Sequence, residues 1–218
     1  MILAIETATN ICSVSYQDDQ GKIYEKRTER KGSHSELLFL FVRELMEEQS
    51  FKMSDMNAVL VSSGPGSYTG LRIAASAVKG MLFELNTEIY AANTLAGFAE
   101  LAKDGTIHSV INARRKHLYH QQFRKGDVLE AVTKSRILEL DEINSLLSPG
   151  HQIIGSGINR LDSEKLEEMK ILNESEISAT ALISLFYTEA KDNFFTKTTA
   201  EELESNYLSS SQVNNTKI

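Results

Sequence analysis

The order of the elements that the sequence predicts repeats once along the chain. Each half opens with strands of alternating apolar and polar residues and continues with a helix, a short strand and a glycine turn. The first half contains strands 2–5, 12–16, 22–28, 58–62 and 89–91, turn 64–70, and helices 35–49, 71–85 and 94–101. The second contains strands 107–112, 118–124, 128–137 and 152–154, turn 155–157, and helices 141–147 and 178–191. This repetition predicts an α/β fold of two duplicated lobes, residues 1–102 and 103–218, each a mixed sheet with flanking helices.

Two predicted helices carry more apolar surface than one core requires. Ser33 and Glu36 form a capping box before the first, whose apolar side chains spread over about 200°, twice the usual width. On the second helix, small residues Ser76 and Gly80 would let a partner's backbone approach. We therefore expect these helices to form an association surface, with candidate partner-binding residues Phe39, Arg43, Met46, Arg72, Ser76, Lys79 and Phe83.

The two glycine turns are candidate anion sites, because backbone N–H groups at a strand-to-helix turn can hold a phosphate. The residues concerned are Gly64, Gly66, Ser67, Thr69, Gly155 and Gly157. The first turn has no following Gly-Lys-Ser/Thr of a Walker loop, and its glycine spacing does not fit a dinucleotide fingerprint. Two interpretations stay open: a weak nucleotide or anion site, or a purely structural turn.

The composition excludes several function classes. A net charge of −7 argues against a protein that itself grips nucleic acid, and the cluster Arg114, Arg115 and Lys116 is short. The single cysteine, Cys12, excludes an internal disulfide. No apolar run approaches the ~20 residues of a membrane span, and the first residues do not resemble a signal peptide. We therefore expect a cytoplasmic protein without a membrane contact.

No arrangement of residues predicts catalysis or metal binding. The five histidines, at 34, 108, 117, 120 and 151, never fall four apart on a predicted helix. His117 and His120 would point to opposite faces of one strand. The Gly-x-Ser-x-Gly elbow of a serine hydrolase is absent, and Ser156 between two glycines lacks the rest of that pattern.

Several motifs, in order and spacing, closely resemble the TsaB (YeaZ) family over nearly the whole chain. The most specific is Gly-Pro-Gly-Ser-Tyr-Thr-Gly-Leu-Arg at 64–72, and the strand 2–9 with its Glu-Thr-Ala-Thr ending supports it. Further landmarks are His-Ser-Glu-Leu-Leu at 34–38, Asn-Ala-Arg-Arg at 112–115 with Tyr119, Gly-Ser-Gly at 155–157, and Tyr-Leu at 207–208.

The resemblance implies an actin-like, Hsp70-like, sugar-kinase-like fold and a role without catalysis. Such proteins pair with the related transferase subunit TsaD, alongside the ATPase TsaE, to form N6-threonylcarbamoyladenosine in tRNAs that read codons beginning with adenine. The resemblance implies a homodimer when TsaD is absent and contact with tRNA only through the complex. TsaD-type subunits bind their metal with His-x-x-x-His, whereas here Leu38 follows His34, so no metal is expected.

Three positions depart from the family pattern. Glu6 stands where an Asp is usual, which weakens an ATPase interpretation and leaves at most weak binding of ATP or ADP. Asn112 replaces an Asp, and Ser205 and Ser209 replace a usual Pro and Arg near the carboxyl end, where the predicted loose tail 209–218 follows. The alternatives to a scaffold subunit are a nucleotide-dependent phosphotransferase of the sugar-kinase class and a peptidase.

Overall fold

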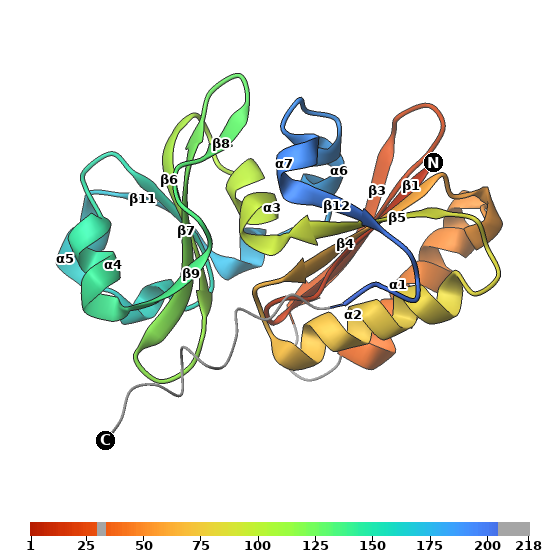
Figure 1. Cartoon of the computed structure of the whole chain (residues 1–218), viewed down its shortest axis with the longest axis horizontal. Helices are drawn as coiled ribbons and strands as arrows, with labels where there is room; N and C mark the ends of the chain where they lie inside the picture. Colours follow the sequence, from red (N-terminus) through yellow and green to blue (C-terminus); the bar gives the residue numbers. More distant parts are fainter. Residues whose placement is uncertain (30–33, 205–218) are drawn as a thin grey trace.

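The computed structural model describes residues 1–29 and 34–204, which form two mixed six-stranded sheets with helices between them and on their outer faces (Figure 1). The first sheet has the order β12-β5-β4-β1-β2-β3. Its strands are β1 (Ile2–Glu6), β2 (Ile11–Gln17), β3 (Ile23–Glu29), β4 (Ala58–Gly64), β5 (Glu88–Asn93) and β12 (Phe195–Thr198). β4 runs parallel to both β1 and β5, and the other pairs are antiparallel.

Helices cover both faces of this sheet, which explains why β1 is one continuous apolar run. Leu3 and Ile5 pack against α1 (His34–Gln49) and α2 (Tyr68–Met81). Ile2 and Ala4 point the other way, into a core that includes α3 (Thr94–Glu100) and α6 (Thr180–Phe186). Side chains alternate along a strand, so a single segment serves both layers.

The second sheet repeats the plan of the first. Its order is β11-β10-β6-β7-β8, and β9 also pairs with β7. The strands are β6 (Gly105–Asn112), β7 (His117–Lys125), β8 (Leu129–Ala131), β9 (Arg136–Glu139), β10 (Gln152–Gly155) and β11 (Lys170–Leu172). β10 runs parallel to β6 as β4 does to β1. The outer face of this sheet packs against α4 (Leu140–Leu146). Leu161, just before α5 (Ser163–Glu167), and Leu166 within α5 pack in the same apolar cluster. The predicted α/β fold of two mixed-sheet lobes is therefore confirmed.

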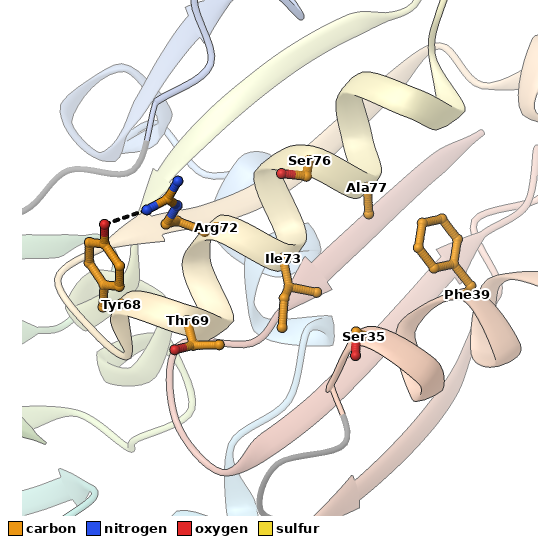
Figure 2. Close-up of a pocket in the computed structure, with 8 residues that line it drawn as sticks. All are labelled: Ser35, Phe39, Tyr68, Thr69, Arg72, Ile73, Ser76 and Ala77. Atoms are coloured by element: carbon orange, nitrogen blue, oxygen red, sulfur yellow. Dashed lines mark hydrogen bonds between the residues drawn. The ribbon is translucent and has the colours of Figure 1, made fainter.

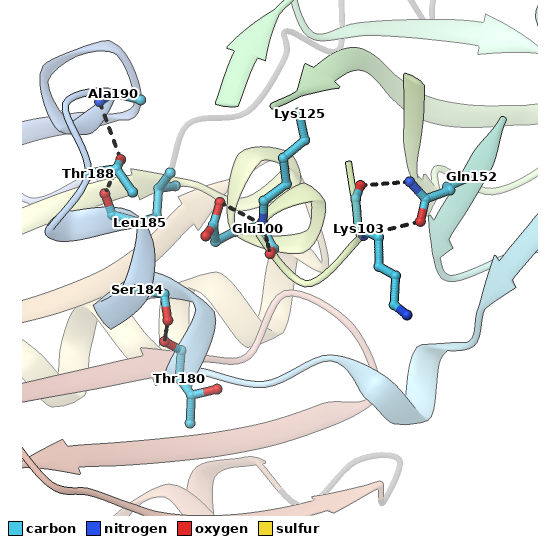
Figure 3. A network of polar contacts seen from close by, with 9 residues as sticks. All are labelled: Glu100, Lys103, Lys125, Gln152, Thr180, Ser184, Leu185, Thr188 and Ala190. Atoms are coloured by element: carbon cyan, nitrogen blue, oxygen red, sulfur yellow. Dashed lines mark hydrogen bonds and ion pairs between the residues drawn. The ribbon is translucent and has the colours of Figure 1, made fainter. Parts of the chain in front are cut away.

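The inner helices join the two sheets. One apolar cluster contains Leu60 of the first sheet, Leu95 and Phe98 of α3, and Ile107 and Phe123 of the second sheet. Polar contacts reinforce this junction at the end of α3 (Figure 3).

In that junction the ammonium group of Lys125 on β7 lies 3.2 Å from the carboxylate of Glu100, and both side chains are largely buried. The Gln152 amide donates to the carbonyl of Lys103 at 2.7 Å and accepts from its N–H at 3.1 Å.

After the second sheet the chain returns to the first. α6 packs on α3, and α7 (Lys191–Phe194) leads into β12, which pairs with β5 so that Phe195 lies opposite Ala92. The division into residues 1–102 and 103–218 stays a prediction. The topology adds that residues 195–198 complete the first sheet, not the second.

Some predicted boundaries were wrong. The expected strand 128–137 is two strands, β8 and β9. The N–H groups of Val132 and Thr133 both donate to the carbonyl of Gln122, which interrupts the regular pairing between them. The expected helix 178–191 is divided into α6 and α7, separated by a turn in which Thr188 donates to the carbonyl of Leu185. The side chain of Asn93 caps α3 by accepting from the Ala96 N–H.

Three shorter 3-10 helices, η1 (Met53–Asp55), η2 (Ile158–Arg160) and η3 (Glu174–Glu176), complete the described part of the chain. No helix in this part combines the length and apolar character that crossing a bilayer requires. The predicted Ser33 cap, Tyr207 and Leu208, Ser205 and Ser209, and the tail 209–218 lie outside the described residues.

Candidate protein–protein interface

A groove of about 470 Å³ runs between α1 and α2 on the side away from the sheet (Figure 2). Leu38, Val42 and Leu45 anchor α1 in the core. Phe39 points the other way and stays 51% exposed. The groove is lined by Ser35, Phe39, Tyr68, Thr69, Arg72, Ile73, Ser76 and Ala77. An exposed aromatic ring beside small and aliphatic side chains is typical of an association surface.

Arg72 and Tyr68 form one rim of the groove. They lie one turn apart on α2, where Nη1 of Arg72 donates to the hydroxyl of Tyr68 (Figure 2). The guanidinium also lies 5.1 Å from the centre of the Tyr68 ring. Both side chains are exposed, yet each limits the motion of the other. Arginine and tyrosine held in place lose less entropy when a partner binds, so this rim is suited to recognition.

The structure divides the predicted partner-binding residues among three places. Phe39, Arg72 and Ser76 line the groove. Arg43 is exposed on α1, 4.0 Å from Glu47, and Met46 is half-buried.

Lys79 and Phe83 instead line a second cavity, of about 760 Å³, between the end of α2 and residues 197–201. The Lys79 ammonium donates to the Glu201 carbonyl at 3.1 Å. The expected helix 71–85 begins and ends earlier, so Phe83 lies beyond α2 in a turn where Glu84 has a φ of 61°. Phe83 is 74% exposed, and its predicted place on the helix face was wrong.

Several backbone donors of the first glycine turn bind the protein itself. The Gly64 N–H binds the Thr94 hydroxyl at 3.0 Å, and the Ser67 N–H binds the Ala8 carbonyl at 2.7 Å. The Ser67 hydroxyl caps α2 by accepting from Gly70 at 3.2 Å. A Cβ on Gly70 would lie 1.9 Å from the Thr7 carbonyl oxygen. A side chain at Gly70 would therefore prevent this close packing.

The second turn has the same design. Ser156 donates its N–H to the Val110 carbonyl at 3.0 Å, and its hydroxyl accepts from Asn112 at 3.1 Å. Gly155 has a φ of 129°, and a Cβ there would lie 1.8 Å from the Val110 oxygen. In both turns a serine N–H therefore binds a backbone carbonyl in or just after a central strand: Ala8 follows β1, and Val110 lies in β6. Thr69 lies in the α1–α2 groove, whereas Gly157, with a φ of 83°, packs beside Asn112. Nucleotide binding at these turns stays a prediction.

The structure brings together three histidines that the sequence analysis treated as unrelated. His108, His120 and His151 form a row of ring contacts on the second sheet. Across residues 1–29 and 34–204, no group of three or more His, Cys, Asp or Glu side chains is arranged to hold a metal ion.

Comparisons with known proteins show which family and which fold this chain resembles. The family model described as TsaD, tRNA N6-adenosine threonylcarbamoyltransferase, matches residues 23–206. The tRNA threonylcarbamoyladenosine biosynthesis protein TsaB of Escherichia coli is 27% identical over 81% of this chain and 80% of its own length. The TsaB protein of Bacillus subtilis is 27% identical over 72% of this chain and 70% of its own. YeaZ from Pseudomonas aeruginosa has the same fold, with a TM-score of 0.80, 23% identity and coverage of 95% and 99% of the two chains.

The chain belongs to the TsaB (YeaZ) family. Its two mixed-sheet lobes are those of the actin-like, Hsp70-like, sugar-kinase-like fold.

One departure from the TsaB pattern has a clear structural setting. Glu6 ends β1 with its carboxyl group fully buried. It accepts from the Ala8 N–H at 2.6 Å and from the Ser62 hydroxyl. Burial raises the pKa of Glu6 to about 7, although the bonds from Ser62 and Ala8 oppose this shift. The carboxyl group is thus tied to β4 and the following backbone.

The chain also lacks the second histidine of a His-x-x-x-His pair. His34 is buried, and its Nε2 lies 3.1 Å from the Ile11 carbonyl oxygen. Leu38, one turn later, is fully buried in the core beneath α1. The two side chains therefore serve to attach α1 to the first sheet.

Proposed function

We propose that this chain is a non-catalytic partner subunit in the formation of N6-threonylcarbamoyladenosine in tRNAs that read codons beginning with adenine. The observation that supports it best is the exposed α1–α2 groove with its Tyr68 and Arg72 rim. In this proposal the groove binds TsaD, a relative whose family model matches most of this chain. A structural relative can present a similar pair of helices, so the contact would be a four-helix packing.

The absence of catalysis in this chain is part of the proposal. The TsaD-type pair of metal-binding histidines is replaced by His34 and Leu38, of which Leu38 is fully buried. Glu6 is bound to Ser62 and Ala8, and in each glycine turn the serine N–H binds a carbonyl of the protein itself. These contacts favour a scaffold over a sugar-kinase-like phosphotransferase. No observation favours a peptidase.

The same groove would serve more than one assembly. Without TsaD, two copies of this chain would pair through α1 and α2, and TsaD would compete with that homodimer. TsaE would join the complex, and tRNA would contact this chain only as part of it, in agreement with the net charge of −7. Each of these partners is an expectation from the family.

Phe39→Glu tests the groove directly. A carboxylate buried against an apolar partner face loses its hydration, so this variant should lose both the homodimer and the complex with TsaD. Sedimentation velocity of the chain alone, and then with TsaD of the same organism, measures both assemblies. Circular dichroism checks the fold.

Val132→Glu is the matched control, because Val132 is also 51% exposed but lies in the second lobe. It should assemble as the wild type does. If Phe39→Glu retains wild-type affinity for TsaD, the groove is the wrong surface. If both variants lose binding, the effect is one of added charge, not of the groove.

A further inference from the structure

Three imidazole rings form a row across neighbouring strands of the second sheet. Nε2 of His120 on β7 lies 3.0 Å from Nδ1 of His108 on β6. Nε2 of His108 lies 3.0 Å from Nδ1 of His151, the residue before β10. Both separations are hydrogen bonds, so His108 uses both of its ring nitrogens within the row.

The row runs from the apolar core to the surface. His120 is two residues from Leu118, His108 is two from Val110, and His151 is two from Ile153, so all three face the outer apolar cluster. His108 and His120 are 0% exposed. His151 is half-buried, in the connection between α4 and β10. Only the His151 end of the row therefore meets solvent.

The direction of the hydrogen bonds follows from the buried end. Nδ1 of His120 is buried and has no hydrogen-bond partner in the described part of the chain. A buried N–H without an acceptor is rarer than an acceptor without a donor, so this nitrogen is best left unprotonated. His120 then donates from Nε2 to His108, and His108 donates from Nε2 to Nδ1 of His151. His151 closes the row as an acceptor.

The charged groups around the row agree with this direction. Arg136 on β9 lies opposite His120 in the sheet, and its charge favours a lone pair on that ring. Burial lowers the pKa of His108 to about 4 and that of His120 to about 3, with smaller contributions from neighbouring rings. Arg160 on η2 is half-buried and donates to the Asn112 side-chain oxygen at 2.6 Å and to the His117 carbonyl at 3.3 Å. The other charged side chains of the elements packed on this face are exposed: Glu139, Asp141, Glu142, Asp162, Glu164, Lys165, Glu167, Glu168 and Lys170.

We propose that His151 is a proton-sensitive latch, which when neutral fastens the α4–β10 connection to the second sheet. A proton taken from water by His151 puts N–H on both of its nitrogens. The ring then cannot accept, so the buried His108 N–H loses its acceptor. The backbone next to His151 then loosens as well. In the neutral state this backbone is held by two hydrogen bonds, from the Gly150 N–H to the Glu168 carbonyl at 3.0 Å and from the Lys170 N–H to the His151 carbonyl at 3.0 Å.

Hydrogen exchange of the full-length protein, read by mass spectrometry at pH 7.5 and 5.5, measures the latch. Protection factors, corrected for the intrinsic pH dependence of exchange, should fall on the order of tenfold in residues 148–152 and 168–172 at the lower pH. One lost buried hydrogen bond has an effect of that size. Residues of β1 and β4 report the change in global stability with pH and should lose less protection than these two segments.

The His151→Asn variant distinguishes the latch from a general loss of stability at low pH. The Asn side-chain oxygen takes the place of Nδ1 and still accepts from His108, but the residue does not titrate. In this variant residues 148–152 and 168–172 should lose no more protection at pH 5.5 than β1 and β4 do. His117→Asn, a half-exposed histidine outside the row, should respond as the wild type does.

Two results would overturn the proposal. In one, residues 148–152 of the wild type lose no more protection at pH 5.5 than β1 and β4 do, or His151→Asn responds to pH as the wild type does. In the other, zinc raises the Tm of the wild type but not of His151→Asn, which would show a metal site. If His151→Asn does not fold, the wild-type and His117→Asn profiles still decide.

Discussion

At the scale of single residues, Glu6 and the pair His108 and His120 make the stability of the fold depend on pH in opposite directions. The folded-state pKa of Glu6 is raised to about 7 from 4.5 by burial, so the folded state holds a proton that the unfolded chain has released. Stability from this group is complete below pH 4.5 and is lost as the pH rises through 7. For His108 and His120 the pKa is lowered to about 4 and 3 from 6.5. Their contribution is complete above pH 6.5 and is lost as the pH falls.

Glu6→Gln should stabilise the protein in alkaline solution. The amide keeps an acceptor for Ala8 and a donor for Ser62 but never ionises. Its unfolding free energy should exceed that of the wild type by roughly 3 kcal/mol at pH 8.5, and the difference should shrink toward pH 4.5. Urea unfolding at several pH values measures it. Glu29→Gln, an exposed carboxylate on β3, is the control and should show a nearly constant difference. A stability difference for Glu6→Gln that does not change with pH would contradict this account.

In the Glu6→Gln background the histidines are left as the main buried titrating groups. Lowering the pH from 7 to 5 should then reduce the unfolding free energy by roughly 2 kcal/mol for each of His108 and His120, because the unfolded state binds protons that the folded state excludes. Urea unfolding at the two pH values provides the measurement. Equal stability at pH 7 and 5 would show that these rings are solvated in the folded state.

At the scale of elements, the close approach of α2 to β1 depends on one glycine. A Cβ on Gly70 would lie 1.9 Å from a backbone oxygen, which cannot move without shifting the end of β1. Gly80, on the same helix, has nothing within 4 Å of the position of a Cβ. Alanine substitutions at these two positions therefore distinguish the effect of close packing on stability from the effect of helix propensity.

Gly70→Ala should lower the unfolding free energy by about 3 kcal/mol or more, because α2 must leave its place on the sheet. Gly80→Ala should raise it by about 0.5–1 kcal/mol through helix propensity alone. Chemical denaturation of both variants gives the two values. A mild effect of Gly70→Ala would mean that the turn can relax around the new methyl group.

Elements with a local signal were predictable, and those that depend on distant pairing were not. The amphipathic spacing of α1 placed it within one residue, and the Gly64–Gly70 segment located the strand-to-helix turn. The end of α2 was missed because Leu82 and Leu85 continue the apolar spacing after the backbone has turned. The division into β8 and β9 depends on Gln122, which lies on another strand.

The candidate groove was predicted only in part for a similar reason. Phe39, Arg72 and Ser76 were found because helical periodicity fixes the face on which they lie. The Tyr68 rim was missed because the predicted helix began after it. The histidine row requires the register of β6 against β7, in which Val110 faces His120, and also the pairing of β10 with β6. Neither can be read from spacing within one segment.

At the scale of the whole molecule, the two sheets share one inner layer, and the α1–α2 face is uncovered in the described part of the chain. The cluster around α3 joins both lobes, and the Lys125 and Glu100 pair lies at that junction. The α1–α2 face lies on the far side of the first sheet (Figure 1). Binding of a partner there would leave the inner layer intact, as expected of a scaffold.

Reconstituted tRNA modification tests the central claim most directly. Unmodified tRNA with threonylcarbamoyl-adenylate should give no product with this chain alone. Product should form when TsaD and TsaE of the same organism are added with the wild type or Val132→Glu, but should be largely lost with Phe39→Glu. Product from this chain without TsaD would contradict a non-catalytic role, and full activity of Phe39→Glu would contradict the assignment of the groove.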